Sequence, residues 1–165
     1  MKKINLLFIV IFLSGCSVMK DFEQSDDENS SKITVERALS APLLGSSTFI
    51  YATNNKRNCK GDSSGNDTKF MVLDKLNPLV SEYNENGVFV ENGKELSLLF
   101  QSVAELRQCT IIATFTPESA SNYHIVLRGR IGSILDYCEA VLYRVNKISK
   151  KPVADKFSVY QSCET

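Results

Sequence analysis

The stretch that decides the fold is residues 122–131, which read NYHIVLRGRI. Apolar and polar side chains alternate along it, and a period of two is typical of a β-strand with one buried face and one solvated face. The buried set is Tyr123, Ile125, Leu127 and Ile131, and the solvated set includes His124, Arg128 and Arg130. We therefore predict an antiparallel sheet around this strand.

The same period continues on both sides of this strand. Residues 137–146 and 156–163 repeat the alternation, and residues 109–116 place on one face Cys109, Ile111, Ala113 and Phe115. Short turns at residues 117–121 and 132–135 separate these segments and can join neighbouring strands. The C-terminal part of the chain should therefore form a four-stranded antiparallel meander.

Residues 96–106 carry a helical pattern instead. Apolar residues recur there at the spacing of one helical face, namely Leu96, Leu99, Phe100, Val103 and Leu106. Just before them, Asn92 with Glu95 three residues later resembles a capping box. We therefore expect an amphipathic helix packed on the meander sheet, and an α+β, mainly β fold.

The first half of the domain is less regularly patterned. Residues 48–53, 69–74 and 88–91 are rich in β-formers and should be short strands. Residues 32–44 fit either a helix or a strand, and residues 77–83 can begin a helical turn. Residues 54–68 are polar and contain glycine, which predicts a long loop that carries Cys59.

The N-terminus has the pattern of an export signal. Lys2 and Lys3 precede an apolar segment at residues 4–13, which is shorter than the roughly 20 residues that a membrane span needs. The segment ends in Leu13-Ser14-Gly15-Cys16, which resembles the lipobox of bacterial lipoprotein precursors. An ordinary signal peptide with a chance cysteine is the alternative.

The lipobox resemblance implies cleavage before Cys16, acylation of its thiol and acylation of the new amino group. Two or three acyl chains anchor a protein stably to a membrane. Ser17 stands where aspartate would retain such a lipoprotein in the inner membrane, so the resemblance implies the outer membrane, with the chain lipid-anchored on its periplasmic face.

These features divide the chain into three parts. Residues 1–15 should be the signal peptide. Residues 16–31 should be the lipidated N-terminus and a flexible tether, since residues 17–31 contain five acidic residues, one lysine and little that could be buried. Residues 32–165 should be a single periplasmic globular domain.

Five cysteines are an odd number for an oxidising compartment. Assigning Cys16 to lipid leaves four for two disulfides: Cys59, Cys109, Cys138 and Cys163. Three connectivities are possible. If residues 146 and 155 flank the last turn, Cys138 lies opposite Cys163, and Cys59 then pairs with Cys109. No C-x-x-C spacing supports the rival interpretation, a zinc site, so we predict no metal.

Little in the sequence indicates catalysis. Residues 61–65 match G-x-S-x-G, but they lie between a loop and a strand and not between a strand and a helix, so Ser63 is not predicted to be a nucleophile. His124 is the only histidine. It would act as a general base only if it met a carboxylate and a hydroxyl in a cleft. We predict no catalytic residue and no cofactor.

The remaining feature is the basic row His124, Arg128 and Arg130. It could meet an acidic partner, an anionic glycan or lipid head groups, or be an ordinary solvated face. The chain carries 19 basic and 19 acidic residues, so its net charge gives no basis for a nucleic-acid partner.

The leading hypothesis is a non-enzymatic accessory lipoprotein that binds an envelope protein, in secretion or envelope assembly. The alternative is a small-ligand-binding or hydrolase-inhibiting β-barrel. An internal cavity above roughly 300 Å³ would favour a small ligand, whereas a filled core would favour protein interaction.

Overall fold

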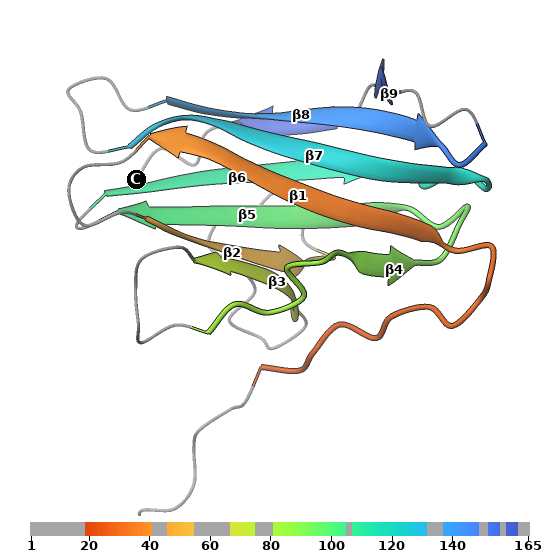
Figure 1. Cartoon of the computed structure of the whole chain (residues 1–165). Coiled ribbons are helices and arrows are strands. Elements are labelled where there is room, and N and C mark those ends of the chain that lie inside the picture. The colour runs from red at the N-terminus through yellow and green to blue at the C-terminus, as the bar shows by residue number, and fades with distance from the viewer. Residues whose placement is uncertain are drawn as a thin grey trace, which may run out of the picture.

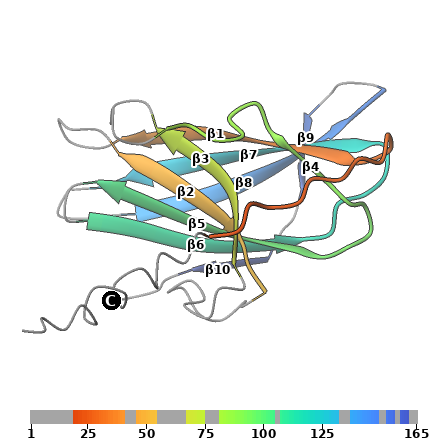
Figure 2. The ribbon, with the colours of Figure 1, turned by 90° about the horizontal axis from the view of Figure 1, so that it is seen from below.

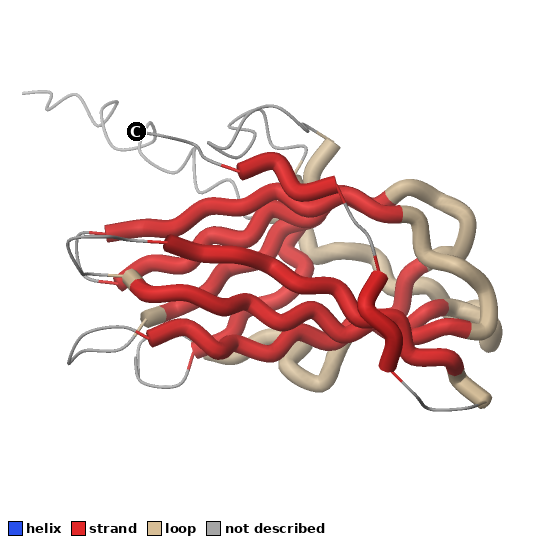
Figure 3. The backbone as a smooth tube through the Cα atoms, turned by 90° about the horizontal axis from the view of Figure 1, so that it is seen from above, coloured by secondary structure: helices blue, strands red, loops and turns tan. Residues whose placement is uncertain are grey.

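A computed structural model describes residues 19–40, 46–54, 67–74, 81–104, 107–131, 137–148, 152–155 and 158–161. Within these ranges the chain forms ten β-strands, and Figure 3 shows strands and loops but no helix. None of the described residues therefore belongs to a helix that is long and apolar enough to cross a membrane. The prediction of an α+β fold is wrong for this part of the chain.

The strands form two five-stranded sheets that face each other as a β-sandwich. The β7 sheet has the order β4-β1-β7-β8-β9 and the β5 sheet has the order β10-β6-β5-β2-β3. Figures 1 and 2 show the two layers from two directions. The strands are β1 (Ser31–Ser40), β2 (Ser47–Ala52), β3 (Thr68–Asp74), β4 (Val88–Val90), β5 (Leu96–Ala104), β6 (Arg107–Phe115), β7 (Ser121–Arg130), β8 (Tyr137–Asn146), β9 (Pro152–Asp155) and β10 (Ser158–Gln161).

The inner faces of both sheets supply one hydrophobic core. The predicted buried faces of β6 and β7 are confirmed, since both contribute to the core and Cys109 packs against it. Ile131, the last residue predicted to be buried, is 1% exposed. From β1 and β5 the core receives Ile33, Val35, Leu98 and Phe100. Alternation thus identified the buried side of β6 and of β7.

The helix predicted over residues 96–106 is replaced by β5, which pairs with β2 on one side and β6 on the other. Leu98 and Phe100 point into the core, whereas Leu99 points to the opposite side of the sheet and is also fully buried. A central strand that is buried on both faces loses the polar half of its alternation. The resulting apolar run matches a helical spacing by coincidence.

The predicted four-stranded meander is also wrong. Of the four strands that correspond to the predicted meander, only β7 and β8 lie side by side in sequence order, because β6 and β10 pair with each other in the β5 sheet. The turn at residues 117–121 crosses between sheets, and β9 is an additional strand beside β8. On its other side β7 pairs in parallel with β1, which aligns Thr34 with His124. The alternating pattern of a strand indicates which of its side chains are buried, but it does not indicate which strands pair with it.

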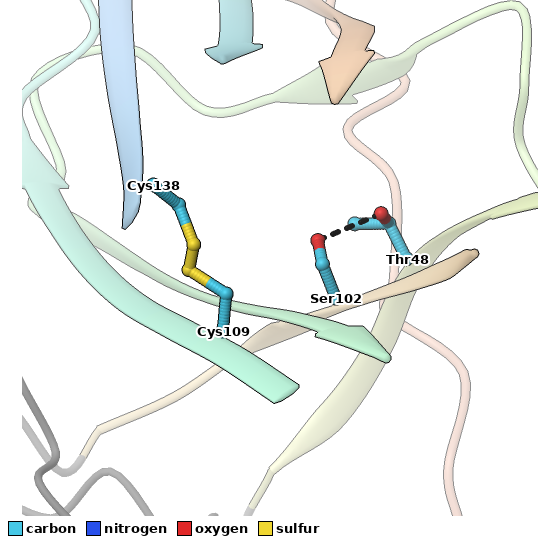
Figure 4. The surroundings of a disulfide bond; sticks show 4 residues. All are labelled: Thr48, Ser102, Cys109 and Cys138. Atoms are coloured by element: carbon cyan, nitrogen blue, oxygen red, sulfur yellow. Dashed lines mark hydrogen bonds between the residues drawn. A yellow bond between two sulfur atoms is a disulfide. The ribbon is translucent and has the colours of Figure 1, made fainter. Parts of the chain in front are cut away.

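Cys109 of β6 and Cys138 of β8 form a disulfide that joins the two sheets, with a Cα–Cα distance of 6.3 Å (Figure 4). The predicted pairs Cys59–Cys109 and Cys138–Cys163 are therefore wrong. Cys138 lies opposite Gly129 of β7, and β10 has left for the other sheet. Cys59 and Cys163 lie outside the described residues.

The N-terminal segment does not hang free where the structure describes it. Residues 20–25, here called the strap, run along β3 and β4, and Figure 1 shows this segment below both strands. The flexible tether predicted for residues 16–31 is therefore bound to the domain over the strap. β1 begins at Ser31, one residue before the predicted domain start.

Candidate functional site

The predicted basic row lies on the outer surface of the β7 sheet. Because side chains alternate along a strand, His124, Arg128 and Arg130 point away from the core that receives Tyr123, Ile125 and Leu127. The neighbouring strands add Thr34 and Glu36 from β1 and Tyr143 from β8. We call these six residues the β7 face: Thr34, Glu36, His124, Arg128, Arg130 and Tyr143.

His124 is held from both ring nitrogens by side chains of β1. Its Nδ1 lies 3.0 Å from Oγ1 of Thr34, and its Nε2 lies 3.1 Å from Oε2 of Glu36. The His124 side chain is 35% exposed and that of Glu36 is 62% exposed. The ring is therefore fixed in orientation while its edge remains accessible to solvent.

The two arginines continue the face along β7. Arg128 donates to the phenol oxygen of Tyr143 at 3.2 Å, and its register partner on β8 is Glu139. Arg130 is exposed and lies beside Tyr137, which is 60% exposed. The result is an open sheet face that carries charged groups and tyrosine rings.

Sequence reasoning found β7's share of the face but missed its neighbours. Thr34 and Glu36 belong to β1, which the sequence left open between helix and strand. The alternation of residues 32–36, KITVE, is the signal that could have placed both on a solvated strand face. That β1 would lie parallel to β7 had no local signal.

The contact of His124 with a hydroxyl and a carboxylate raises the question of a catalytic triad. The Thr34 hydroxyl also lies 3.3 Å from the carbonyl oxygen of Tyr123, which can only accept. The single proton of the hydroxyl can be donated to that carbonyl or to Nδ1, because the tautomer of His124 decides whether Nδ1 donates or accepts. A general base would need Nδ1 to accept that proton. The cluster, however, sits on an open sheet face and not in a cleft. We assign it no catalytic role.

A groove of about 560 Å³ lies elsewhere, beside the strap. Its lining includes the apolar residues Phe22, Val90 and Leu96 and the charged residues Lys20, Asp21, Glu23, Glu91, Lys94 and Glu95. It is an open groove at the edge of the sandwich, whereas the space between the sheets holds the hydrophobic core. No residue of the β7 face lines it.

Among the residues that the structure describes, two ionisable groups have clearly shifted pKa values, and both lie outside the β7 face. Burial, with a smaller contribution from the charge of Asp67, raises the pKa of Tyr51. A hydrogen bond with Glu82, and then its charge, raises the pKa of Glu85. Neither shift prepares a group for chemistry at His124. Among the residues described, no cluster of histidine, cysteine and carboxylate side chains could hold a metal ion. The G-x-S-x-G segment at 61–65 lies outside them.

No protein-family model, curated protein or solved structure matches this chain. Any functional assignment therefore rests on the residues and their geometry. Three features are available for it: the lipobox pattern, the β7 face and the groove beside the strap.

Proposed function

We propose that this chain is a lipoprotein anchored through Cys16 to the periplasmic face of the outer membrane, where its β-sandwich binds an envelope protein without catalysing a reaction. The β7 face is the contact surface. The role is that of an accessory protein in secretion or envelope assembly.

The observation that carries this proposal is the fixed and open arrangement around His124. Charged groups and tyrosines on a flat sheet face resemble the composition of protein interfaces, in which arginine and tyrosine are enriched. Hydrogen bonds to Thr34, Glu36 and Tyr143 hold two of the three basic side chains before a partner arrives. Such preorganisation lowers the entropy cost of binding.

The filled core also favours a protein partner over a small ligand enclosed within the sandwich. Sixteen buried residues from both sheets occupy the space in which a ligand-binding barrel would keep its cavity. A flat face suits a large partner, whereas small-molecule sites are concave.

The groove beside the strap supports a second candidate function, small-ligand binding. Its volume of about 560 Å³ falls within the size range of small-molecule sites, and its lining is partly apolar. A ligand there would leave the β7 face free, so substitutions at the two places separate the two functions.

The anchor is tested first, by mass spectrometry of the N-terminal peptide of the protein isolated from membranes. Acylated Cys16 is expected at the new N-terminus. The variant Cys16→Ser should lose the lipid and leave the outer-membrane fraction. A chain that starts elsewhere, or that carries an unmodified Cys16, would overturn the anchor.

The contact surface is tested by crosslinking in the native cells, followed by purification through a C-terminal tag. The double variant Arg128→Glu/Arg130→Glu reverses two charges on the β7 face and should lose the partner captured by the wild type. The control Lys94→Glu reverses a charge at the groove, where the lysine side chain is 76% exposed. Equal losses in both variants would exclude the β7 face as the contact, and loss only in the control would move the site to the groove.

A further inference from the structure

The strap joins the edges of both sheets. On β3, the Phe22 amide donates to the carbonyl of Lys69 and the Lys69 amide donates to the carbonyl of Lys20, both at 2.9 Å. On β4, the Ser25 amide donates to the carbonyl of Phe89 at 3.0 Å, and the Phe89 amide donates to the side chain of Gln24 at 3.1 Å. Because β3 and β4 are edges of opposite sheets, the strap closes this side of the sandwich.

Side chains reinforce the attachment near its beginning. The ring of Phe22 packs edge-on against Phe70 of the core, with 5.0 Å between centroids. Asp21 forms an ion pair with Lys69 at 2.9 Å, and the same ammonium lies 4.0 Å from the ring centre of Tyr83. The chain thus becomes part of the domain at residue 20.

We infer that the strap makes the membrane anchor short and directional, so that the β3–β4 side of the sandwich faces the phospholipid surface. This inference rests on the proposed acylation of Cys16. Three residues separate Cys16 from Lys20, where the strap begins, which limits the link to about 14 Å of extended chain, whereas a free tether of sixteen residues could reach about 50 Å.

The acidic charge of the N-terminal segment indicates that the short link, and not electrostatic attraction to lipid, holds the domain near the membrane. Between residues 17 and 31, five acidic residues accompany one lysine, and anionic head groups repel such a segment. The short link therefore sets the distance to the bilayer. Strand β9 lies on the side of the molecule opposite the strap (Figure 1), so it points away from the membrane. The β7 face then lies on the flank, open to a partner in the periplasm.

Two tyrosines provide a matched test. Tyr83 lies beside Lys69 at the start of the strap, and Tyr137 lies on β8, more than half exposed. The photocrosslinker p-benzoylphenylalanine is placed at either position in the full lipoprotein in its own cells, and adducts with phospholipid are measured by mass spectrometry. We expect severalfold more lipid adduct from position 83, although Tyr137 is the more exposed side chain.

A second variant tests the short link directly. A long glycine–serine spacer between Ser17 and Val18 leaves the sandwich intact and should remove most of the adduct at position 83. Equal adducts at positions 83 and 137, or no effect of the spacer, with Cys16 shown to be acylated, would overturn the orientation and leave the proposed anchor standing. A chain without acylated Cys16 would overturn both.

Discussion

At the residue scale, Gly129 is a position where the backbone leaves no choice of amino acid. Its φ is +148°, and an added Cβ would lie 2.2 Å from the carbonyl oxygen of Tyr137. We expect Gly129→Ala to lower the free energy of unfolding by at least about 1–3 kcal/mol, the range for one strained backbone position. Urea denaturation followed by circular dichroism measures this loss.

Gly93 provides the control for this substitution. Its φ is +75°, and an added Cβ would meet nothing within 4 Å. Gly93→Ala should therefore lower the free energy of unfolding by only about 1 kcal/mol, the cost of placing a residue with a Cβ in the left-handed conformation. If both substitutions cost the same, the close approach of β8 to Gly129 does not determine the residue there.

The raised pKa of Tyr51 predicts how the free energy of unfolding changes at alkaline pH. Its pKa is raised above the ordinary value of 10.0, chiefly by burial and secondarily by the charge of Asp67. Stability linked to the neutral phenol is fully present below pH 10 and is lost as the pH rises through the folded-state pKa, because the unfolded chain releases this proton first. Tyr51→Phe should therefore flatten the decline of unfolding free energy that begins near pH 10 and ends as the pH passes the raised folded-state pKa. Asp67→Asn should lower the pKa of Tyr51 only in part, as measured by phenolate absorbance. A full return of this pKa to its ordinary value would show that burial is not the main cause of the shift.

The candidate site shows how far sequence reasoning reaches at this scale. The solvated side of residues 122–131 could be predicted because a strand exposes alternate residues. The partners of His124 could not, because Thr34 and Glu36 lie 90 and 88 residues away in sequence. Only the parallel pairing of β1 with β7 brings them together, and no local pattern specifies a pairing across that separation.

At the element scale, β5 shows why a strand that is buried on both faces can be mistaken for a helix in the sequence. Leu98, Leu99 and Phe100 are all buried, so the segment shows neither alternation nor a polar face. The apolar content of such a strand is then the same as that of a short amphipathic helix. Length does not separate the two either, because the apolar pattern spans residues 96–106, which falls within the roughly ten to twelve residues of a short helix.

The disulfide Cys109–Cys138 gives a prediction for the contact between the two sheets. It closes a segment of 29 residues, for which chain entropy predicts about 3–4 kcal/mol of stabilisation. The double variant Cys109→Ala/Cys138→Ala should lose an amount of this order in urea denaturation. Ser102→Ala, which removes the buried hydroxyl partner of Thr48 beside the disulfide (Figure 4), should cost less, about 1–3 kcal/mol. Equal stability of the double variant and the wild type would show that the bridge does not constrain the unfolded chain.

The remaining cysteines follow from the same pairing. If the domain holds two disulfides, Cys59 must pair with Cys163 once Cys109 is bound to Cys138. Non-reducing peptide mapping should recover a linked peptide pair that contains residues 59 and 163. Recovery of either residue linked to Cys109 or Cys138 would contradict the bridge between β6 and β8.

At the scale of the whole molecule, the two sheets are linked to each other in two different ways. The disulfide joins β6 to β8 within the two sheets, whereas the strap joins the edge strands β3 and β4. Composition predicted a free tether, because residues 17–31 contain five acidic residues and one lysine. The ring contact of Phe22 and the four hydrogen bonds to β3 and β4 hold the strap on the domain despite this composition. Each of these hydrogen bonds satisfies a donor or acceptor that an edge strand would otherwise leave unpaired.

Phe22 should therefore contribute to the stability of the entire domain. Phe22→Ala removes the contact with Phe70, and for a partly buried ring we expect a loss of about 2 kcal/mol in unfolding free energy. Hydrogen exchange should become faster at the amides of Phe22 and Ser25, which bond to β3 and β4. The control Phe89→Ala removes a ring that is 43% exposed on β4 and should cost less than about 1 kcal/mol. Equal losses in the two variants, or fast exchange of both amides in the wild type, would show that the strap is not part of the folded unit and that the anchor is long.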